Sequence, residues 1–224
     1  MPNATRKPSA PYSLAIATSD TASLRALTRR ERLDHDRLPH QARQREWLAG
    51  RLAGKRAIGA VLGATLPMHR IELEPQPGSA PRCLVLDDVE RWTLAPLVLS
   101  IAHADGMAIA VAANHSTRIG VDVERACGID AEHHRYFLAP SELAHARHLG
   151  VTLFWVLKEA LWKALGLSQA LAFRSVQLAF FHGTDTLAGA WVEGCWIRAR
   201  ARRVRLATRP DLIAAVVTVD DEAR

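Results

Sequence analysis

Three apolar runs with strand-like composition follow one another in the middle of the chain and limit the fold more than any other feature. They cover residues 94–102, 107–113 and 118–124. Turn residues separate them, at Asp105 and Gly106 and again over 114–117. Short apolar runs bounded by such residues are typical of neighbouring strands. The middle of the chain is therefore expected to form a sheet.

Helical patterns lie on both sides of this predicted sheet. Residues 41–62 contain helix formers throughout, and five apolar side chains fall on one arc of a helical wheel: Trp47, Leu48, Leu52, Ile58 and Leu62. A second helical pattern covers 130–149, with a break where Pro140 can open a new helix. A third runs over 152–165 and predicts a strong helix.

Strand candidates return after Gly166, at residues 173–181, 191–206 and 212–219, whereas the Pro- and Gly-containing stretch 74–81 is expected to be a loop. Helix and strands are thus followed by helices and strands. We expect an α+β fold with two similar, pseudo-symmetric halves. The predicted organisation is a flexible Pro-rich tail over 1–11, an N-terminal half over 12–116 and a C-terminal half over 117–224.

Composition indicates a globular protein of the cytoplasm. The chain has 224 residues with 49% apolar content, enough for one sizeable core or two small joined ones. No apolar run approaches the roughly 18 residues that a membrane span needs, and the first residues lack the apolar segment of a secretion signal. The three cysteines, Cys83, Cys127 and Cys195, lie far apart and form no CxxC pair, as expected of reduced thiols.

A net charge of +6 favours an acidic partner without identifying it. Basic residues gather over 25–56 and over 197–206, where alternation places Arg198, Arg200 and Arg202 on one face of a predicted strand. A solvated face is the ordinary explanation. A nucleic-acid surface needs aromatic side chains among the arginines, and the sequence neighbours of these arginines are mainly alanines, so nucleic acid is not the expected partner.

Two carboxylates stand out in the third run of the predicted sheet. Alternation in Ile119-Gly-Val-Asp-Val-Glu124 sends the apolar residues to the core and places Asp122 and Glu124 together on the other face. Their Cβ atoms are then roughly 7 Å apart. Paired carboxylates suit a hard cation such as Mg²⁺, which completes its shell with water and substrate phosphates. An exposed edge strand would explain the same pair without any ligand.

The predicted helix 152–165 has two distinct sides. Its core stripe contains Phe154, Leu157 and Leu161, and Trp155, Glu159, Trp162 and Lys163 lie together on another side. Glu159 and Lys163 are four residues apart and can form an ordinary surface pair. Two tryptophans beside them suggest instead a side that is buried or covered by a ligand.

Three further residues have unusual positions. Arg51 and Lys55 fall inside the apolar arc of the first helix, so they either extend along apolar surface to water or point into a phosphate pocket. His103 ends a predicted strand, where a structural role is commoner than a catalytic one. A zinc site is not expected, because the paired histidines His145 and His148 have no cysteine or third ligand at zinc spacing.

Together these residues resemble a known family. A strand ending in His103, then Gly-Val-Asp-Val-Glu124, then Trp155-x-x-Lys-Glu-Ala-x-x-Lys163 is similar to the surfactin-synthetase type of 4'-phosphopantetheinyl transferase. The likeness runs from about residue 43 to 181 and includes the segment 137–142. Its elements are short, but their order and spacing together are specific.

The resemblance implies a reaction and a set of partners. Such an enzyme, a holo-[acyl-carrier-protein] synthase, moves the 4'-phosphopantetheine arm of coenzyme A to a serine of an acyl or peptidyl carrier protein and releases 3',5'-ADP. It implies Mg²⁺, with Mn²⁺ as an alternative, an acidic carrier protein, and a site at the seam between the two halves. A cytoplasmic monomer is expected.

The resemblance also implies roles for individual residues. Mg²⁺ would be held by Asp122, Glu124 and Glu159, with Glu159 also the base for the carrier serine. Lys163 would stabilise or protonate the leaving 3',5'-ADP. Contacts to coenzyme A are implied for Arg43, Arg51, His103, Asp122, Lys158 and Lys163.

The chain departs from the family pattern at two places. Ala102 and Ala104 flank His103 where many relatives have serines, and the loop 76–81 lacks a lysine often found there, with only Arg82 near. Both changes are expected to lower coenzyme A affinity. Two other functions remain open: a catalytically idle relative that binds carrier proteins, and a basic nucleic-acid-binding module.

Overall fold

The computed structural model describes residues 12–20, 22–63, 66–76, 79–86, 92–129, 131–167 and 173–220. The first elements are a strand, helices and short 3₁₀ turns, namely β1 (Tyr12–Thr18), η1 (Leu24–Ala26), α1 (Arg29–Asp36), α2 (Gln41–Leu62) and η2 (Met68–Arg70). Five strands follow: β2 (Ile71–Gln76), β3 (Ser79–Leu86), β4 (Trp92–Leu94), β5 (Leu97–Ala104) and β6 (Met107–Asn114).

The rest of the chain follows a similar order, a strand, helices and then further strands, with four final strands where the first part has five. It begins with β7 (Arg118–Arg125), η3 (Ala131–His133), α3 (His134–Phe137), η4 (Pro140–Glu142), α4 (Leu143–Leu149) and α5 (Val151–Leu165). After η5 (Phe173–Ser175) come four strands: β8 (Val176–Phe180), β9 (Leu187–Val192), β10 (Cys195–Val204) and β11 (Leu212–Val219).

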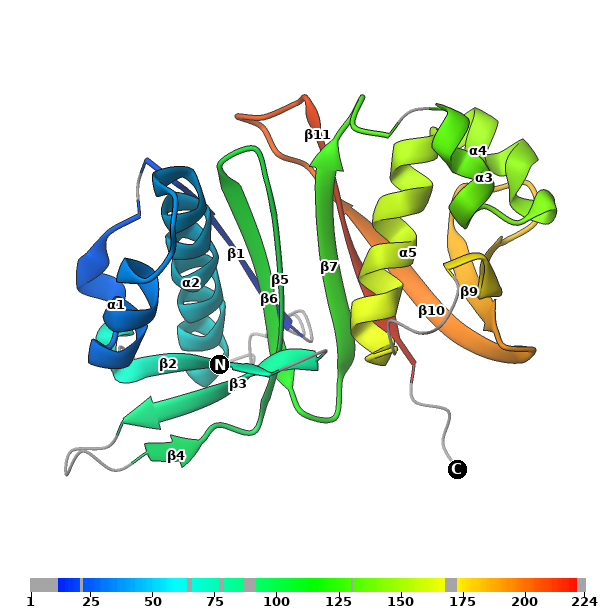
Figure 1. Ribbon diagram of the computed structural model, residues 1–224. Helices are drawn as coiled ribbons and strands as arrows, with labels where there is room; N and C mark the ends of the chain where they lie inside the picture. The colour runs from blue at the N-terminus through cyan, green and yellow to red at the C-terminus, as the bar shows by residue number, and fades with distance from the viewer. Residues whose placement is uncertain are drawn as a thin grey trace, which may run out of the picture.

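The strands form three antiparallel sheets, and one long helix packs against each of two of these sheets. Strand order is β1-β6-β5 in one sheet, β2-β3-β4 in the second and β7-β11-β10-β9-β8 in the third. Figure 1 shows α2 and α5 standing roughly side by side, with β5, β6 and β7 between them. The protein is therefore a mixed α/β structure.

Helix α2 has the bounds that its sequence predicts, Gln41–Leu62. Its apolar arc packs on β1, β5 and β6, with Ala53, Ala57 and Ile58 fully buried. Gly54 permits a close approach, because a Cβ there would lie 2.8 Å from Leu73. Burial of this arc, at about 25 cal/mol per Å² of apolar area, is the main force that holds the helix.

The sheet β1-β6-β5 and the five-stranded sheet meet through β5 and β7. Ile119, Val121 and Val123 of β7 are buried in a cluster with residues of β5, β6 and β11. The backbone N–H of Val121 also donates to Ser100 Oγ of β5, at 3.1 Å. This contact fixes the edge of the five-stranded sheet against the first sheet. Val121, which makes this hydrogen bond, is next in sequence to Asp122, one of the carboxylates that the sequence singled out.

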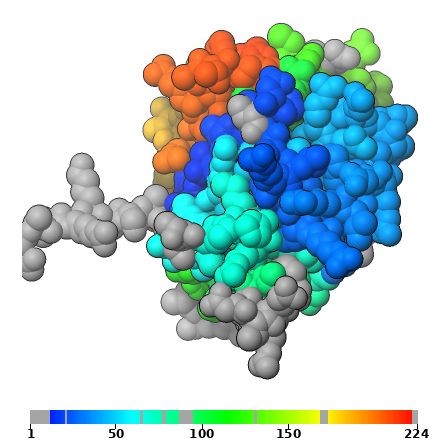
Figure 2. Space-filling model, turned by 90° about the vertical axis from the view of Figure 1, so that its left-hand side faces the viewer, coloured from blue at the N-terminus to red at the C-terminus, as the bar shows by residue number. Residues whose placement is uncertain are grey.

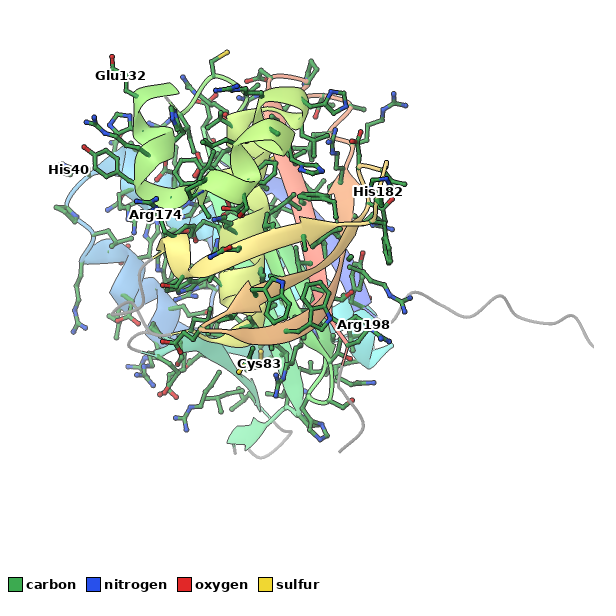
Figure 3. The ribbon with its side chains drawn as sticks, turned by 90° about the vertical axis from the view of Figure 1, so that its right-hand side faces the viewer. His40, Cys83, Glu132, Arg174, His182 and Arg198 are labelled. Carbon is green, nitrogen blue, oxygen red and sulfur yellow. The ribbon has the colours of Figure 1, made fainter. Side chains whose placement is uncertain are left out.

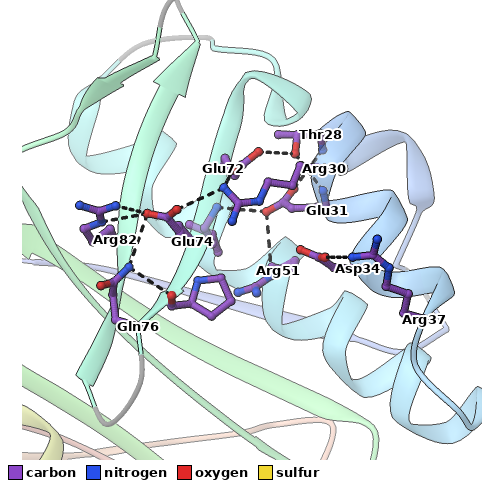
Figure 4. A network of polar contacts seen from close by, with 12 residues as sticks. Thr28, Arg30, Glu31, Asp34, Arg37, Arg51, Glu72, Glu74, Gln76 and Arg82 are labelled. Atoms are coloured by element: carbon purple, nitrogen blue, oxygen red, sulfur yellow. Dashed lines mark hydrogen bonds and ion pairs between the residues drawn. The ribbon is translucent and has the colours of Figure 1, made fainter.

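A buried lysine joins α2 to the elements around it. Lys55 Nζ donates to Ala26 O at 2.7 Å and to a carboxylate oxygen of Glu31. The same carboxylate accepts from the backbone N–H of Thr28 at 2.9 Å and of Leu73 at 3.1 Å. Figure 4 shows Glu31 among these partners. One carboxylate thus holds α1, α2 and β2 together.

The same pattern of contacts occurs around α5. Lys158 Nζ donates to Phe137 O at 2.5 Å and to Glu142 Oε2 at 2.7 Å. The Glu142 carboxylate accepts from the backbone N–H of Ala139 and of Leu178, both at 2.7 Å. Glu31 lies three residues after Thr28, and Glu142 lies three residues after Ala139. In each pair the glutamate accepts from the backbone N–H of the earlier residue. Two distant parts of the sequence therefore build the same local network.

Several sequence-based boundaries need correction. The stretch 191–206 is not one strand, because Glu193 and Gly194, both with positive φ, form the turn between β9 and β10. Residues 74–76 and 79–81, expected in a loop, instead belong to the paired antiparallel strands β2 and β3. The pattern over 130–149 is a series of short helices, and Phe173 opens η5 instead of a strand. Turn chemistry and local burial outweigh the periodicity there.

Helices and strands from different parts of the chain form the outer surface. Figure 2 shows one side, where α1 and α2 (blue) adjoin β2 and β3 (cyan), and the region of β10 (orange) lies at the opposite corner. None of the described helices is long and apolar enough to span a membrane. The predicted tail over 1–11 lies outside the described residues.

Candidate functional site

The two carboxylates of β7 face α5, as alternation along the strand predicts. Strand β7 sits at the edge of its sheet beside α5, and Asp122 is buried while Glu124 is partly exposed. Gly120, on the same face, permits this packing, because a Cβ there would overlap Ala160 O and lie 2.7 Å from Ala164 N of α5. The glycine in the motif therefore lets strand and helix approach closely.

Helix α5 brings an acid and a lysine to the same place. Its buried stripe includes Phe154, Leu157 and Leu161, which leaves Glu159 and Lys163 on the side that faces β7. Lys163 Nζ donates to Asp122 Oδ1 at 2.7 Å and lies 3.3 Å from Val121 O. The structure thus joins residues 41 positions apart in sequence.

The three acids influence each other. Burial raises the pKa of Asp122 even though Lys163 lowers it. Burial, followed by the charge of Asp122, raises the pKa of Glu124. The pKa of Glu159 is also raised by burial, and by the charges of Asp122 and Glu124, against the effect of Lys163. Acids that repel one another in this way favour a shared cation.

Asp122 has unused binding capacity. Its Oδ2 is buried and has no hydrogen-bond partner among the described residues. A buried charged oxygen without a partner is costly, so the site as it stands favours a further cation or donor. Hard oxygen ligands of this kind fit Mg²⁺ or Mn²⁺. Within the described ranges, no three His, Cys, Asp or Glu side chains already stand in metal-binding geometry.

A cleft of about 550 Å³ opens beside these residues. Its walls come from both parts of the chain: Ser79, Ala80 and Pro81 of β3, the middle of β5, and Glu159, Trp162 and Lys163 of α5. Gly166, Leu167 and Phe173 close one end. The cleft is large enough for a nucleotide-sized ligand, and its wall holds three of the residues that the sequence singled out, Glu159, Trp162 and Lys163.

Two aromatic stacks explain the tryptophans of α5. Phe173 lies between Trp155 and Trp162, with ring centroids 4.9 Å and 4.8 Å away and nearly parallel planes. The Trp155 side chain also hydrogen-bonds Glu124. The second side of the helix is therefore covered by the chain itself. Trp155 is a positioning residue that the sequence alone did not reveal.

His103 lies close enough to act on the acids. It is exposed at the end of β5, and its charge when protonated lowers the pKa of Asp122 and of Glu124. Ala102 beside it is buried. His103 is therefore on the same side of the molecule as the three carboxylates.

The structure does not bring Lys158 to this site. Its side chain is 0% exposed and its ammonium is held by Glu142 and Phe137 O. Burial lowers its pKa. A phosphate cannot reach the ammonium without disrupting that network, so the sequence-based role for Lys158 conflicts with the geometry.

Arg43 and Arg51 are not among the described residues that line the cleft. Arg43 is largely exposed and lies 3.8 Å from Glu46. Arg51 is buried, with its guanidinium 4.4 Å over the ring of Trp47 and its Nε 3.9 Å from Glu31. Burial lowers the pKa of Arg51. Its position in the apolar arc thus has a structural explanation.

A second hollow adjoins Glu124 on the side away from the cleft. Its lining includes Ile129, His133, Tyr136 and Trp155. Tyr136 is 60% exposed, whereas Phe137 is 2% exposed. Glu124 therefore lines this mainly apolar hollow and is not among the described residues that line the cleft.

Comparison with known proteins agrees with the central part of this site. Residues 118–212 match a family model described as the 4'-phosphopantetheinyl transferase superfamily, ACPS. The match begins at the first residue of β7 and ends at the first residue of β11, so it includes all three acids and Lys163. No curated protein matches the chain.

Proposed function

We propose that the chain is a 4'-phosphopantetheinyl transferase of the surfactin-synthetase type. It transfers the 4'-phosphopantetheine arm of coenzyme A to a serine of an acidic acyl or peptidyl carrier protein and releases 3',5'-ADP. One observation supports this above all. Asp122, Glu124 and Glu159 form a set of mutually repelling acids with Lys163, and Glu159 and Lys163 of this set line a nucleotide-sized cleft.

The proposal includes two pseudo-symmetric halves, over 12–116 and 117–224, with the site at the seam. The repeated order of elements supports this. So do the two matching lysine networks, Lys55 with Glu31 and Lys158 with Glu142. The cleft takes its lining from β3 and β5 on one side and from α5 on the other.

Asp122, Glu124 and Glu159 would hold Mg²⁺, with Mn²⁺ as an alternative. Support comes from the unpartnered Oδ2 of Asp122 and from the raised pKa values of all three acids. A divalent ion bound there would withdraw charge from the diphosphate oxygens.

Glu159 is the proposed base. Its raised pKa moves it toward the pH at which proton transfer is efficient. It takes the proton of the carrier serine hydroxyl as the serine oxygen bonds to the β-phosphorus of coenzyme A. The bond from that phosphorus to the bridging oxygen breaks, and the leaving oxygen departs with 3',5'-ADP. Lys163, beside Asp122, stabilises or protonates that leaving group.

His103, Arg43 and Arg51 are the proposed contacts for coenzyme A phosphates. His103 lies near the acids. Arg51 would have to exchange Glu31 and Trp47 for phosphate, so we expect its contribution to be smaller than the resemblance implies. The loop 76–81 has no lysine where relatives often have one. Arg82, which follows this loop, is paired with Glu74. Together with Ala102, this favours a modest coenzyme A affinity.

The carrier protein is proposed to dock at the hollow beside Glu124. Phe137 and Leu138, beside this hollow, are buried. The exposed ring of Tyr136 and the side chains of Ile129 and His133 offer the accessible surface. A carrier helix placed there brings its serine next to the acids. The protein is proposed to act as a cytoplasmic monomer, in line with a site built within one chain.

The test is the intact mass of an apo carrier protein after incubation with the protein, coenzyme A and Mg²⁺. We expect a gain of about 340 Da that is absent with Glu159→Gln. The control Asp20→Asn, which changes an exposed acid distant in sequence from Glu159, should keep the gain. No gain with several apo carriers, although coenzyme A binds, would favour a catalytically idle relative. A gain that survives in Glu159→Gln would remove Glu159 from the mechanism.

A further inference from the structure

The outer face of β8, β9 and β10 combines aromatic and cationic side chains. Strand register places Trp196 of β10 directly opposite Trp191 of β9, and alternation puts Arg198, Arg200 and Arg202 on the same face as Trp196. We call these five residues the Trp–Arg face. Figure 3 views the molecule from this side, with Arg198 labelled beside the strands. Trp196 precedes Arg198 on the same strand, and Trp191 is added from across the hairpin.

The two indoles form a partly exposed aromatic platform. Trp191 is 47% exposed, and its ring centroid is 5.4 Å from that of Trp196, with the planes tilted by 58°. Trp196 lies down over Gly189 of β9, because a Cβ there would be 2.7 Å from the indole. The missing side chain at Gly189 thus lets the ring cover the backbone beside Arg198. Exposed aromatic surface of this extent is typical of a binding site.

The arginines continue the platform along β10. Successive side chains on one face of a strand are about 7 Å apart. All three arginines are exposed, and the side chain of Arg200 is 76% exposed although Asp220 lies 3.4 Å away. Alanines alternate with them and face α5. The row therefore presents a line of positive charge next to the indoles.

We propose that the Trp–Arg face binds an acidic segment of a protein partner, separately from the cleft. Trp and Arg are the residues that contribute most often to the central energy of protein interfaces. The row of arginines complements carboxylates placed on alternate residues of an extended segment, and the Trp191–Trp196 platform accepts one apolar side chain of that segment.

Nucleic acid fits the same face less well. Asp220 pairs with Arg200 and Arg202 lies 5.6 Å over the ring of Tyr12, so the row is not the continuous line of cations that tracks a nucleic-acid backbone. The two indoles are also tilted against each other, so they do not offer parallel planes for successive bases. An acidic peptide needs neither parallel planes nor an unbroken row of cations.

The probe is a fluorescein-labelled peptide of twelve residues with Glu at alternate positions, Thr between them and one central Phe. Fluorescence anisotropy measures its binding to the full chain without coenzyme A or carrier protein, so the result is independent of the proposed transfer. We expect Trp191→Ser to weaken binding about tenfold, and the double change Arg198→Ser with Arg200→Ser by a similar factor. Arg147→Ser, which removes an exposed arginine of α4, is expected to leave affinity unchanged.

Charge reversal provides a test that does not depend on lost stability. Arg198→Glu is expected to lose the Glu peptide and gain affinity for a twin in which Lys replaces Glu. Equal weakening by Arg147→Ser would overturn the proposal in favour of diffuse charge attraction. Tighter binding of a twelve-residue oligothymidylate, lost in Trp191→Ser, would make the face a nucleic-acid surface instead. Absence of peptide binding by the unaltered protein would also refute it.

Discussion

Lys163 of α5 and Asp122 of β7 form an ion pair, with 2.7 Å between Nζ and Oδ1, at the point where strand and helix pack most closely. The pair neutralises one oxygen of a buried carboxylate and leaves the other without a partner. It therefore serves two purposes: it holds the strand to the helix, and it keeps a negative oxygen available for a ligand. The first predictions concern these two purposes.

Replacement of Lys163 by Met is expected to reduce stability in a pH-dependent way. Without the ammonium, burial raises the pKa of Asp122 further above its unfolded value. In the variant, the folded protein then holds a proton on Asp122 that the unfolded chain releases. The loss of unfolding free energy therefore grows as pH rises from the unfolded pKa of Asp122 towards its higher folded pKa. We expect about 2 kcal/mol at pH 8 and less at pH 5, measured by urea unfolding in EDTA. Arg32→Met, at an exposed cation of α1, should cost little at either pH, and an equal loss at both pH values would contradict the argument.

Gly120→Ala is expected to separate β7 from α5. The new methyl group would overlap Ala160 O and crowd Ala164 N, both backbone atoms that cannot rotate away. We expect a loss of about 3 kcal/mol in unfolding free energy, together with loss of transfer activity. Gly59→Ala is the matched control, because a Cβ there meets nothing within 4 Å. In a helix it should stabilise by about 0.5–1 kcal/mol. Similar effects of the two changes would show that the close approach is not required.

The role of Lys158 can be decided with two variants. Glu142→Ala leaves a buried ammonium without its carboxylate and should cost about 3–5 kcal/mol. The double change Lys158→Met with Glu142→Leu removes both charges and should recover part of that stability, because the backbone N–H groups of Ala139 and Leu178 still lose their acceptor. We expect the double variant to retain transfer activity, because the structure places Lys158 in the core. A folded double variant whose KM for coenzyme A rises more than tenfold would restore the phosphate contact that the sequence resemblance implies.

Sequence reasoning succeeded where a periodic pattern decides the geometry. The bounds of α2 and the common orientation of Asp122 and Glu124 follow from spacing alone. It failed where the partner is remote in sequence. The resemblance gave Lys158 a contact to coenzyme A, whereas in the structure its ammonium is held by Glu142 and by Phe137 O, 16 and 21 residues away in sequence.

The turn between β9 and β10 was missed for a local reason. Glu193 and Gly194 both adopt positive φ, but Glu-Gly is not among the usual hairpin dipeptides. With the hairpin unseen, Trp191 could not be placed opposite Trp196. Trp191 could therefore not be added to the Trp–Arg face from the sequence, although the alternation of its arginines was predicted correctly.

The thiols should differ sharply in reactivity. Cys127 and Cys195 are exposed and Cys83 is buried, and burial raises the pKa of Cys83 to about 12. At pH 8 we expect two thiols to react quickly with a disulfide reagent and the third only after unfolding. The folded state keeps the Cys83 proton at pH values where the unfolded chain loses it, so this thiol lowers stability as pH rises above about 9. Reaction of all three thiols at one rate in the folded protein would contradict the burial of Cys83.

Trp155→Phe is expected to weaken metal binding while leaving the fold intact. The phenyl ring can keep the stack with Phe173 but has no N–H for Glu124. Loss of a hydrogen bond that orients a ligand typically costs about 10- to 100-fold in metal affinity. We expect a loss near the lower end, read from the Mg²⁺-induced rise in Tm and from a Mn²⁺ titration. Trp162→Phe is the control, because Trp162 stacks on the other side of Phe173. If both variants lose metal affinity equally, the aromatic stack and not the indole N–H orients Glu124.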